Sequence, residues 1–163
     1  MRVEQDPTGW EIGVKEVTLC EEFRRRFGMD QCGGSFSGQE RLRVQFVHHD
    51  HVVVPKPECL PRSWTMLGST KHCAVQGLYE RGRVFTLQGH FEFDRFVNGE
   101  CIKYFFGDWE HGRMEEALGA IDEDDDSAMA AQMVMKFLVE ETASTKGATH
   151  ESMGGLLTPP SQE

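Results

Sequence analysis

The stretch that decides the fold is residues 84–93, which read Val-Phe-Thr-Leu-Gln-Gly-His-Phe-Glu-Phe. Its β-branched and aromatic residues stop at Gln-Gly, which predicts a buried strand over residues 84–88 running into a tight turn. His90 and Glu92 follow the end of this strand, where α/β proteins place reactive groups. A histidine oriented by a carboxylate is the base half of a nucleophilic triad. The alternative is a capped strand end that carries a surface histidine.

Length and charge bound the class of protein. With 163 residues the chain is long enough for one domain with a hydrophobic core. A net charge of −10 argues against a nucleic-acid groove and against an anionic membrane surface. No apolar run is long enough to span a bilayer, and the first residues lack the apolar segment of a signal peptide. We therefore expect neither nucleic acid nor a membrane as a partner.

The cysteines offer no recognisable nucleophile. Five cysteines at irregular spacing, without a Cys-x-x-Cys pair, indicate reduced thiols and a cytoplasmic location. We expect all five to be ordinary buried or partly exposed thiols. They are Cys20, Cys32, Cys59, Cys73 and Cys101.

The stretches on the N-terminal side of residue 84 predict mostly strands. Residues 21–27 are the exception, a short helix closed by Gly28, because glycine is the usual residue after a helix end. Alternating or continuous apolar patterns predict strands over residues 10–19, 41–47, 64–69 and 74–79. Residues 48–51, which read His-His-Asp-His, are predicted to form the turn beyond the second of these strands.

The C-terminal side changes character. Residues 128–141 predict an amphipathic helix that begins after an acidic run, residues 122–126, whose charges suit a helix N-terminus. Residues 142–163 are rich in Ser, Thr, Gly and Pro and predict a disordered tail. The apolar stripe of the helix consists of Met129, Met133, Phe137 and Leu138.

The His-x-Glu stretch resembles the class I glutamine amidotransferase family, in particular its stand-alone GMP synthase-like members and the γ-glutamyl peptidases. In that family a Gly-His-Pro-Glu-Phe segment carries the triad histidine and glutamate. Gly89, His90, Glu92 and Phe93 match this segment, and Phe91 replaces the proline.

Three further landmarks of the family occur in the same order. Residues 9–13 (Gly-Trp-Glu-Ile-Gly) resemble the strand that follows the nucleophile-bearing helix. His48-x-Asp50 resembles the His-x-Asp turn beside the glutamine pocket, and residues 69–77 resemble a Cys-x-Val-Gln-Gly strand pair. The resemblance covers residues 2–140.

The resemblance implies an α/β, flavodoxin-like three-layer fold and a partial amidotransferase domain over residues 1–141. It assigns His90 as general base, Glu92 as its orienter, and His48 and Asp50 to the substrate pocket, with no metal and no cofactor. The full-length form would hydrolyse a γ-glutamyl amide, such as glutamine, through a Cys-His-Glu triad. The nucleophile elbow of the family, Gly-x-Cys-x-Gly, would precede Met1, so we expect this chain to be inactive alone, as a truncated form.

Two alternatives stay open. The first is a non-catalytic binding module that pairs with another protein chain at the incomplete sheet, whose edge would be open. The second is a small metal-binding protein that uses the histidine cluster His48, His49 and His51. Adjacent strand residues face opposite ways, which makes a shared ion on His48 and His49 difficult.

Overall fold

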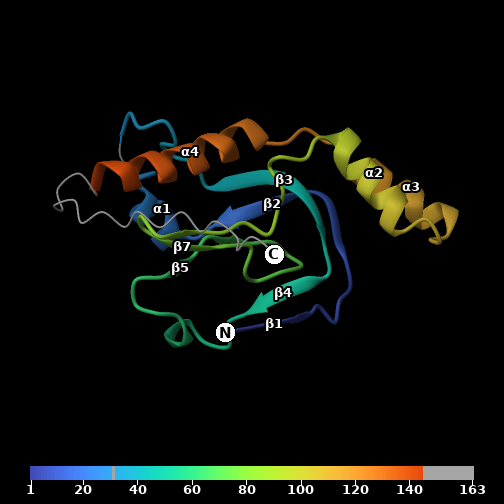
Figure 1. The fold of residues 1–163 in the computed structure, drawn as a ribbon, viewed down its shortest axis with the longest axis horizontal. Coiled ribbons are helices and arrows are strands. Elements are labelled where there is room, and N and C mark those ends of the chain that lie inside the picture. The colour runs from blue at the N-terminus through green and yellow to red at the C-terminus, as the bar shows by residue number, and fades with distance from the viewer. Residues whose placement is uncertain (31, 145–163) are drawn as a thin grey trace, which may run out of the picture.

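The computed structural model describes residues 1–30 and 32–144, which form an α/β fold, as predicted (Figure 1). Every strand pair between described residues is antiparallel. No helix in these ranges is long and apolar enough to cross a membrane. The strands are β1 (Arg2–Gln5), β2 (Glu11–Leu19), β3 (Arg41–His48), β4 (Asp50–Val53), β5 (Thr65–Met66), β6 (Gly68–Ser69), β7 (Leu78–Glu80) and β8 (Val84–Phe85). The helices are α1 (Glu21–Phe27), a 3-10 turn at Pro57–Cys59, α2 (Arg95–Phe105), α3 (His111–Ala120) and α4 (Ser127–Ser144).

The central sheet has the order β3-β2-β6, and the predicted strands over residues 10–19 and 41–47 are its two long members. They pair from Glu11 opposite His48 to Thr18 opposite Arg41. The smaller sheets have the orders β1-β4 and β5-β7-β8. Figure 1 shows the β1–β4 ribbon at the far end from α4.

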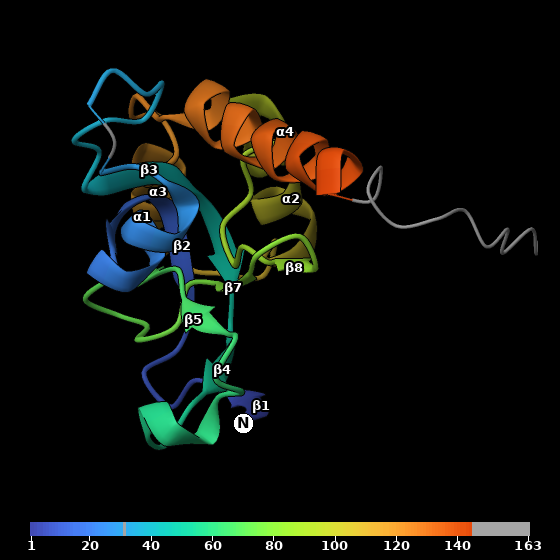
Figure 2. The ribbon, with the colours of Figure 1, turned by 90° about the vertical axis from the view of Figure 1, so that its left-hand side faces the viewer.

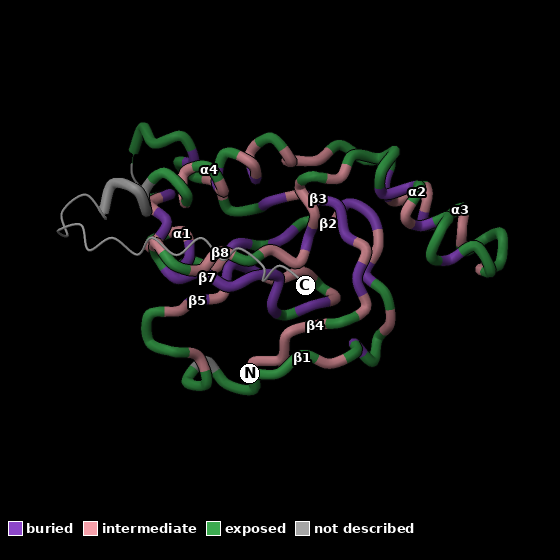
Figure 3. Tube along the Cα trace, in the orientation of Figure 1, coloured by how far each residue is buried: buried purple, intermediate pink, exposed green. Residues whose placement is uncertain are grey.

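Helix α1 forms over the predicted residues for the predicted reason. Gly28 adopts a left-handed conformation with φ of 79°, and its N–H donates to the Arg25 carbonyl. Phe23 and Phe27 are buried in the main core, which also contains Leu42, Val44 and Phe46 of β3. The buried segments therefore meet between α1 and the central sheet (Figure 3).

Helix α4 lies along β3 and closes the same core (Figures 1 and 2). Met133 is fully buried and Phe137 packs against the core, but Leu138 is 47% exposed, so its place in the predicted stripe is wrong. The acidic run fixes the start of the helix, because Asp126 and Arg43 of β3 exchange hydrogen bonds. The helix extends three residues into the predicted tail, and the rest of that tail, residues 145–163, lies outside the described residues.

Helices α2 and α3 have no counterpart in the sequence prediction. Asp94 caps α2 by accepting the N–H of Val97 at 2.8 Å. Ile102, Phe106, Ala117 and Ile121 form a small second core between these helices and the sheet. The apolar stripe is difficult to recognise in the sequence because other large apolar side chains of α2, including Phe96 and Tyr104, are exposed.

The strands between residues 64 and 88 are shorter than predicted. The first stretch divides at Leu67 into β5 and β6, which belong to different sheets, and the second is reduced to β7. The predicted buried strand over residues 84–88 is regular only at half-buried β8. Thr86 interrupts the ladder because its side-chain hydroxyl accepts the N–H of Leu78. The predicted turn at residues 48–51 is also wrong in part, since β4 begins at Asp50.

Gly89 lets the chain approach β3 very closely. A Cβ atom at this position would lie 2.5 Å from Cγ2 of Val44 and 2.8 Å from Cζ of Phe46. Both neighbours are fully buried core residues, so neither has space to withdraw. The absence of a side chain at Gly89 therefore sets the position of the segment that follows it.

The buried face of α4 should carry most of its contribution to stability. Met133→Ala should lower the free energy of unfolding by about 2–5 kcal/mol, because it opens a cavity in the main core. Met135→Ala removes the same side chain from a 59% exposed position of the same helix and should cost less than about 0.5 kcal/mol. Urea unfolding followed by circular dichroism measures both changes, and equal losses would contradict this packing.

The close approach at Gly89 predicts a strong effect of one added methyl group. Gly89→Ala should lower the free energy of unfolding by about 1–3 kcal/mol through overpacking. Gly112→Ala is the matched control, because nothing lies within 4 Å of the added atom. The control should leave stability unchanged or raise it by up to about 1 kcal/mol, since alanine favours the helix. If Gly89→Ala leaves the free energy of unfolding unchanged in the same urea assay, this close approach is ruled out.

Candidate active site

The structure brings His90 and Glu92 together, with 2.7 Å between His90 Nδ1 and Glu92 Oε1. The backbone N–H of His90 donates to the carbonyl of Gln45 at 2.7 Å, which attaches the segment to the outer edge of β3. The imidazole also stacks on the Phe93 ring, with centroids 4.2 Å apart and planes 9° from parallel. Three contacts therefore fix the position and orientation of one ring.

The hydrogen bond of this pair requires a proton on Nδ1 of His90, because the carboxylate of Glu92 only accepts. Partial burial raises the pKa of Glu92, but the hydrogen bond from His90, a backbone hydrogen bond and the charge interaction with His90 together outweigh it and leave the pKa below its usual value. The carboxylate is therefore ionised at neutral pH and accepts the Nδ1 proton. No described residue forms a hydrogen bond with Nε2, and the His90 side chain is 34% exposed. Nε2 can thus present its lone pair to solvent or to a reacting group.

The buried side-chain amides of Gln45 and Asn98 support the His90 segment, and the sequence prediction missed both. Gln45 is 1% exposed, accepts a hydrogen bond from Asn98 at 2.8 Å and donates to the Ile121 carbonyl at 3.0 Å. These bonds connect β3, α2 and the end of α3 at Gln45, the residue whose backbone carbonyl also accepts the His90 N–H. The sequence signal for Gln45 is that a polar residue stands between Val44 and Phe46 in an otherwise apolar stretch.

The structure pairs no cysteine with His90 within the part of the chain that it describes. None of them forms a hydrogen bond with His90. Cys20 and Cys73 have thiol pKa values raised by burial, which favours the unreactive protonated form. Cys32 and Cys59 are exposed, and Cys101 lies in α2.

His48 and Asp50 are the predicted pocket residues. Hydrogen bonds link them to Gln88, two residues before His90. His48 is buried, with Nε2 at 2.9 Å from Glu11 Oε2 and Nδ1 at 3.0 Å from the Asp50 carbonyl. That carbonyl also accepts the side-chain amide of Gln88 at 2.6 Å. Both ring nitrogens of His48 are therefore occupied, and its role in binding substrate stays a prediction.

The histidine cluster does not form a metal centre in the described ranges, where no group of three or more ligating residues could hold an ion. His51 Nδ1 instead contacts the buried Asp6 carboxylate at 2.8 Å. His49 stacks against Trp10 with ring centroids 5.1 Å apart. The metal-binding alternative therefore receives no support.

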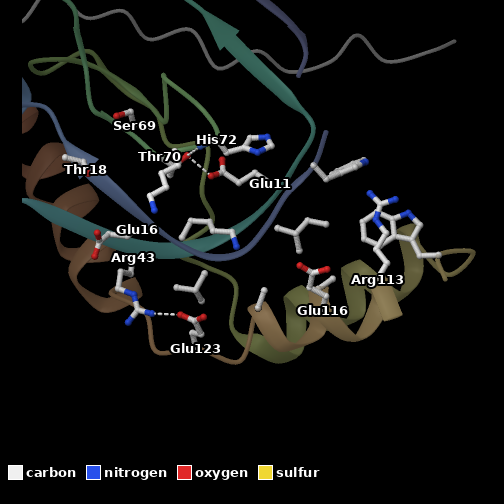
Figure 4. Close-up of a pocket in the computed structure, with 18 residues that line it drawn as sticks. Glu11, Glu16, Thr18, Arg43, Ser69, Thr70, His72, Arg113, Glu116 and Glu123 are labelled. Carbon is white, nitrogen blue, oxygen red and sulfur yellow. Dashed lines mark hydrogen bonds and ion pairs between the residues drawn. The ribbon is translucent and has the colours of Figure 1, made fainter. Parts of the chain in front are cut away.

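Two grooves flank these residues. The larger, about 1020 Å³, follows β2 and is lined by Glu11, Thr70 and His72 among others (Figure 4). The smaller, about 470 Å³, includes Glu92 and Gln45. Glu11 is buried and lines the larger groove. The sequence prediction did not name it as a site residue, although it falls within the Gly-Trp-Glu-Ile-Gly landmark.

Two yeast proteins are similar in sequence, whereas no protein-family model matches the chain. A glutamine amidotransferase-like protein of Schizosaccharomyces pombe is 30% identical over 138 residues, which are 83% of this chain and 50% of that protein. A protein of Saccharomyces cerevisiae, named as a candidate glutamine amidotransferase, is 30% identical over 95 residues, 58% of this chain and 32% of that protein. The chain thus spans half or less of the curated relatives it matches.

The fold is similar to that of a solved glutamine amidotransferase from Methylobacillus flagellatus. The TM-score is 0.55 at 14% identity, over 95% of this chain and 59% of that one. The sequence match and the fold match both extend over most of the chain, and they agree with the motif that contains His90. The chain is similar to glutamine amidotransferases both in sequence and in fold.

Proposed function

We propose that the chain supplies the general base, His90, and its orienting carboxylate, Glu92, for hydrolysis of a γ-glutamyl amide such as glutamine. The observation that carries the proposal is the 2.7 Å hydrogen bond that fixes Nδ1 and leaves Nε2 without a described partner. A base needs this arrangement, because the orienter selects the tautomer that has its lone pair on Nε2.

The chemistry assigned to the pair is nucleophilic. Nε2 of His90 takes the proton of a thiol, and the resulting thiolate attacks the γ-carbonyl carbon of the amide. The imidazolium returns its proton to the leaving nitrogen, so ammonia or an amine departs and a thioester remains. Water, deprotonated by Nε2, then hydrolyses the thioester. Glu92 stabilises the imidazolium at each stage without being protonated itself.

We infer that the thiol belongs to a segment that pairs with the open edge of residues 85–87. The N–H groups of Thr86 and Gln88 point to Leu78 and Gln76, so those of Phe85 and Leu87 point the opposite way. No described strand pairs with that side, and Gln88 and Gly89 alone separate this edge from His90 in the sequence. A strand added there would end beside the imidazole, which would let it deliver a nucleophile.

A glutaminase assay tests this assignment. The chain alone should release no more ammonia from glutamine than its His90→Ala variant. Addition of the half of the S. pombe relative that the chain does not match should produce turnover. His90→Ala should then reduce kcat at least about 100-fold, the contribution expected of a general base.

His111→Ala is the matched control, because His111 is an exposed histidine with its own glutamate partner, Glu115, at 3.4 Å. It should leave the turnover of the mixture unchanged. Turnover by the chain alone that disappears in His90→Ala would place the nucleophile among its own cysteines and contradict the inference. Binding without turnover would favour the non-catalytic module.

A further inference from the structure

A closed ring of hydrogen bonds connects buried Glu11 with the segment that holds His90. Glu11 Oε2 accepts from Gln76 at 2.6 Å and from His48 at 2.9 Å. His48 then donates to the Asp50 carbonyl at 3.0 Å, and the same carbonyl accepts the Gln88 side chain at 2.6 Å. The backbone N–H of Gln88 closes the ring by donating to the Gln76 carbonyl at 2.9 Å.

The carboxylate charge of Glu11 is what holds the ring together. Glu11 is only 3% exposed, and its second oxygen accepts the hydroxyl of Thr70 at 2.6 Å. Three donors therefore converge on one carboxylate. Burial raises the pKa of Glu11, but the hydrogen bonds from His48, Thr70 and Gln76 outweigh it, and the pKa lies below its usual value. His48 faces an acceptor oxygen at each ring nitrogen.

We propose that Glu11 is a positioning residue for His90, acting through His48, the Asp50 carbonyl and Gln88. The proposal rests on the proposed function, because it concerns the same imidazole. Gln88 lies two residues before His90, and its backbone and side chain are both members of the ring. The residue between them, Gly89, packs tightly against Val44 and Phe46 of β3, which leaves the short link from Gln88 to His90 little freedom to absorb a displacement.

Glu11 and His90 share no hydrogen bond among the described residues. Glu11 belongs to the start of β2 and contacts Thr70 at the larger groove (Figure 4), whereas His90 is attached to the outer edge of β3. Loss of the ring should therefore loosen His90 without removing any group that contacts it. This distinguishes positioning from direct participation.

NMR of the intact chain tests the proposal without requiring turnover, so failure of the proposed function and failure of this inference are distinguishable. Glu11→Gln replaces one acceptor oxygen by a donor. It should accelerate hydrogen exchange of the His90 amide about 10-fold or more and weaken the cross-peaks between the His90 and Phe93 rings. Gln88→Ala opens the same ring at a half-buried site and should produce the same two changes. If Glu11→Gln does not fold, Gln88→Ala alone decides.

Two controls separate positioning from general loss of stability. Val17→Ala weakens the same strand in the core but leaves the ring intact, and Glu16→Gln removes an exposed charge. Neither should change His90 exchange relative to the average of the core amides. The double variant Glu11→Gln with Gln88→Ala should loosen His90 no further than either change alone. Additive effects, or equal acceleration in Val17→Ala, would overturn the proposal.

Discussion

The structure depends on one buried carboxylate. Glu11 accepts hydrogen bonds from His48, Thr70 and Gln76, which lie 37, 59 and 65 residues away in the chain. It joins the start of β2, the end of β3 and the loop before β7 at one point. An ion removed from water at this depth is tolerable only because each oxygen has a partner. Removal of any one donor would leave part of that charge uncompensated.

The candidate site differs from Glu11, because one polar atom there has no hydrogen-bond partner among the described residues. His90 is fixed by the Gln45 carbonyl, by Glu92 and by the Phe93 ring, yet its Nε2 has no described partner. Packing and hydrogen bonds elsewhere supply the rigidity that such a group needs, because a base that moves loses its alignment with the proton it removes. Gly89 contributes to this rigidity because it has no side chain. A side chain there would force the segment away from β3.

Local patterns in the sequence were sufficient for the features that have local causes. Alternation located β2 and β3, and Gly28 located the end of α1. His90 and Glu92 were predicted from their place after a strand and from the family motif, and their side chains are in contact. The Glu11 ring could not be predicted, because its members meet only after the chain has folded. Helix α2 was missed because several of its apolar side chains face solvent. The strand at β8 was predicted too long because the Thr86 hydroxyl takes the place of a backbone acceptor.

We propose His90 as a general base whose nucleophile lies on another segment. Intact-mass analysis after treatment with a glutamine-like electrophile tests this assignment, because only a thiol activated by the base should react rapidly. With the unmatched half of the S. pombe relative present, we expect one adduct, on that half, and its loss in His90→Ala. A stoichiometric adduct on Cys20, Cys32, Cys59, Cys73 or Cys101 that requires His90 would contradict the assignment.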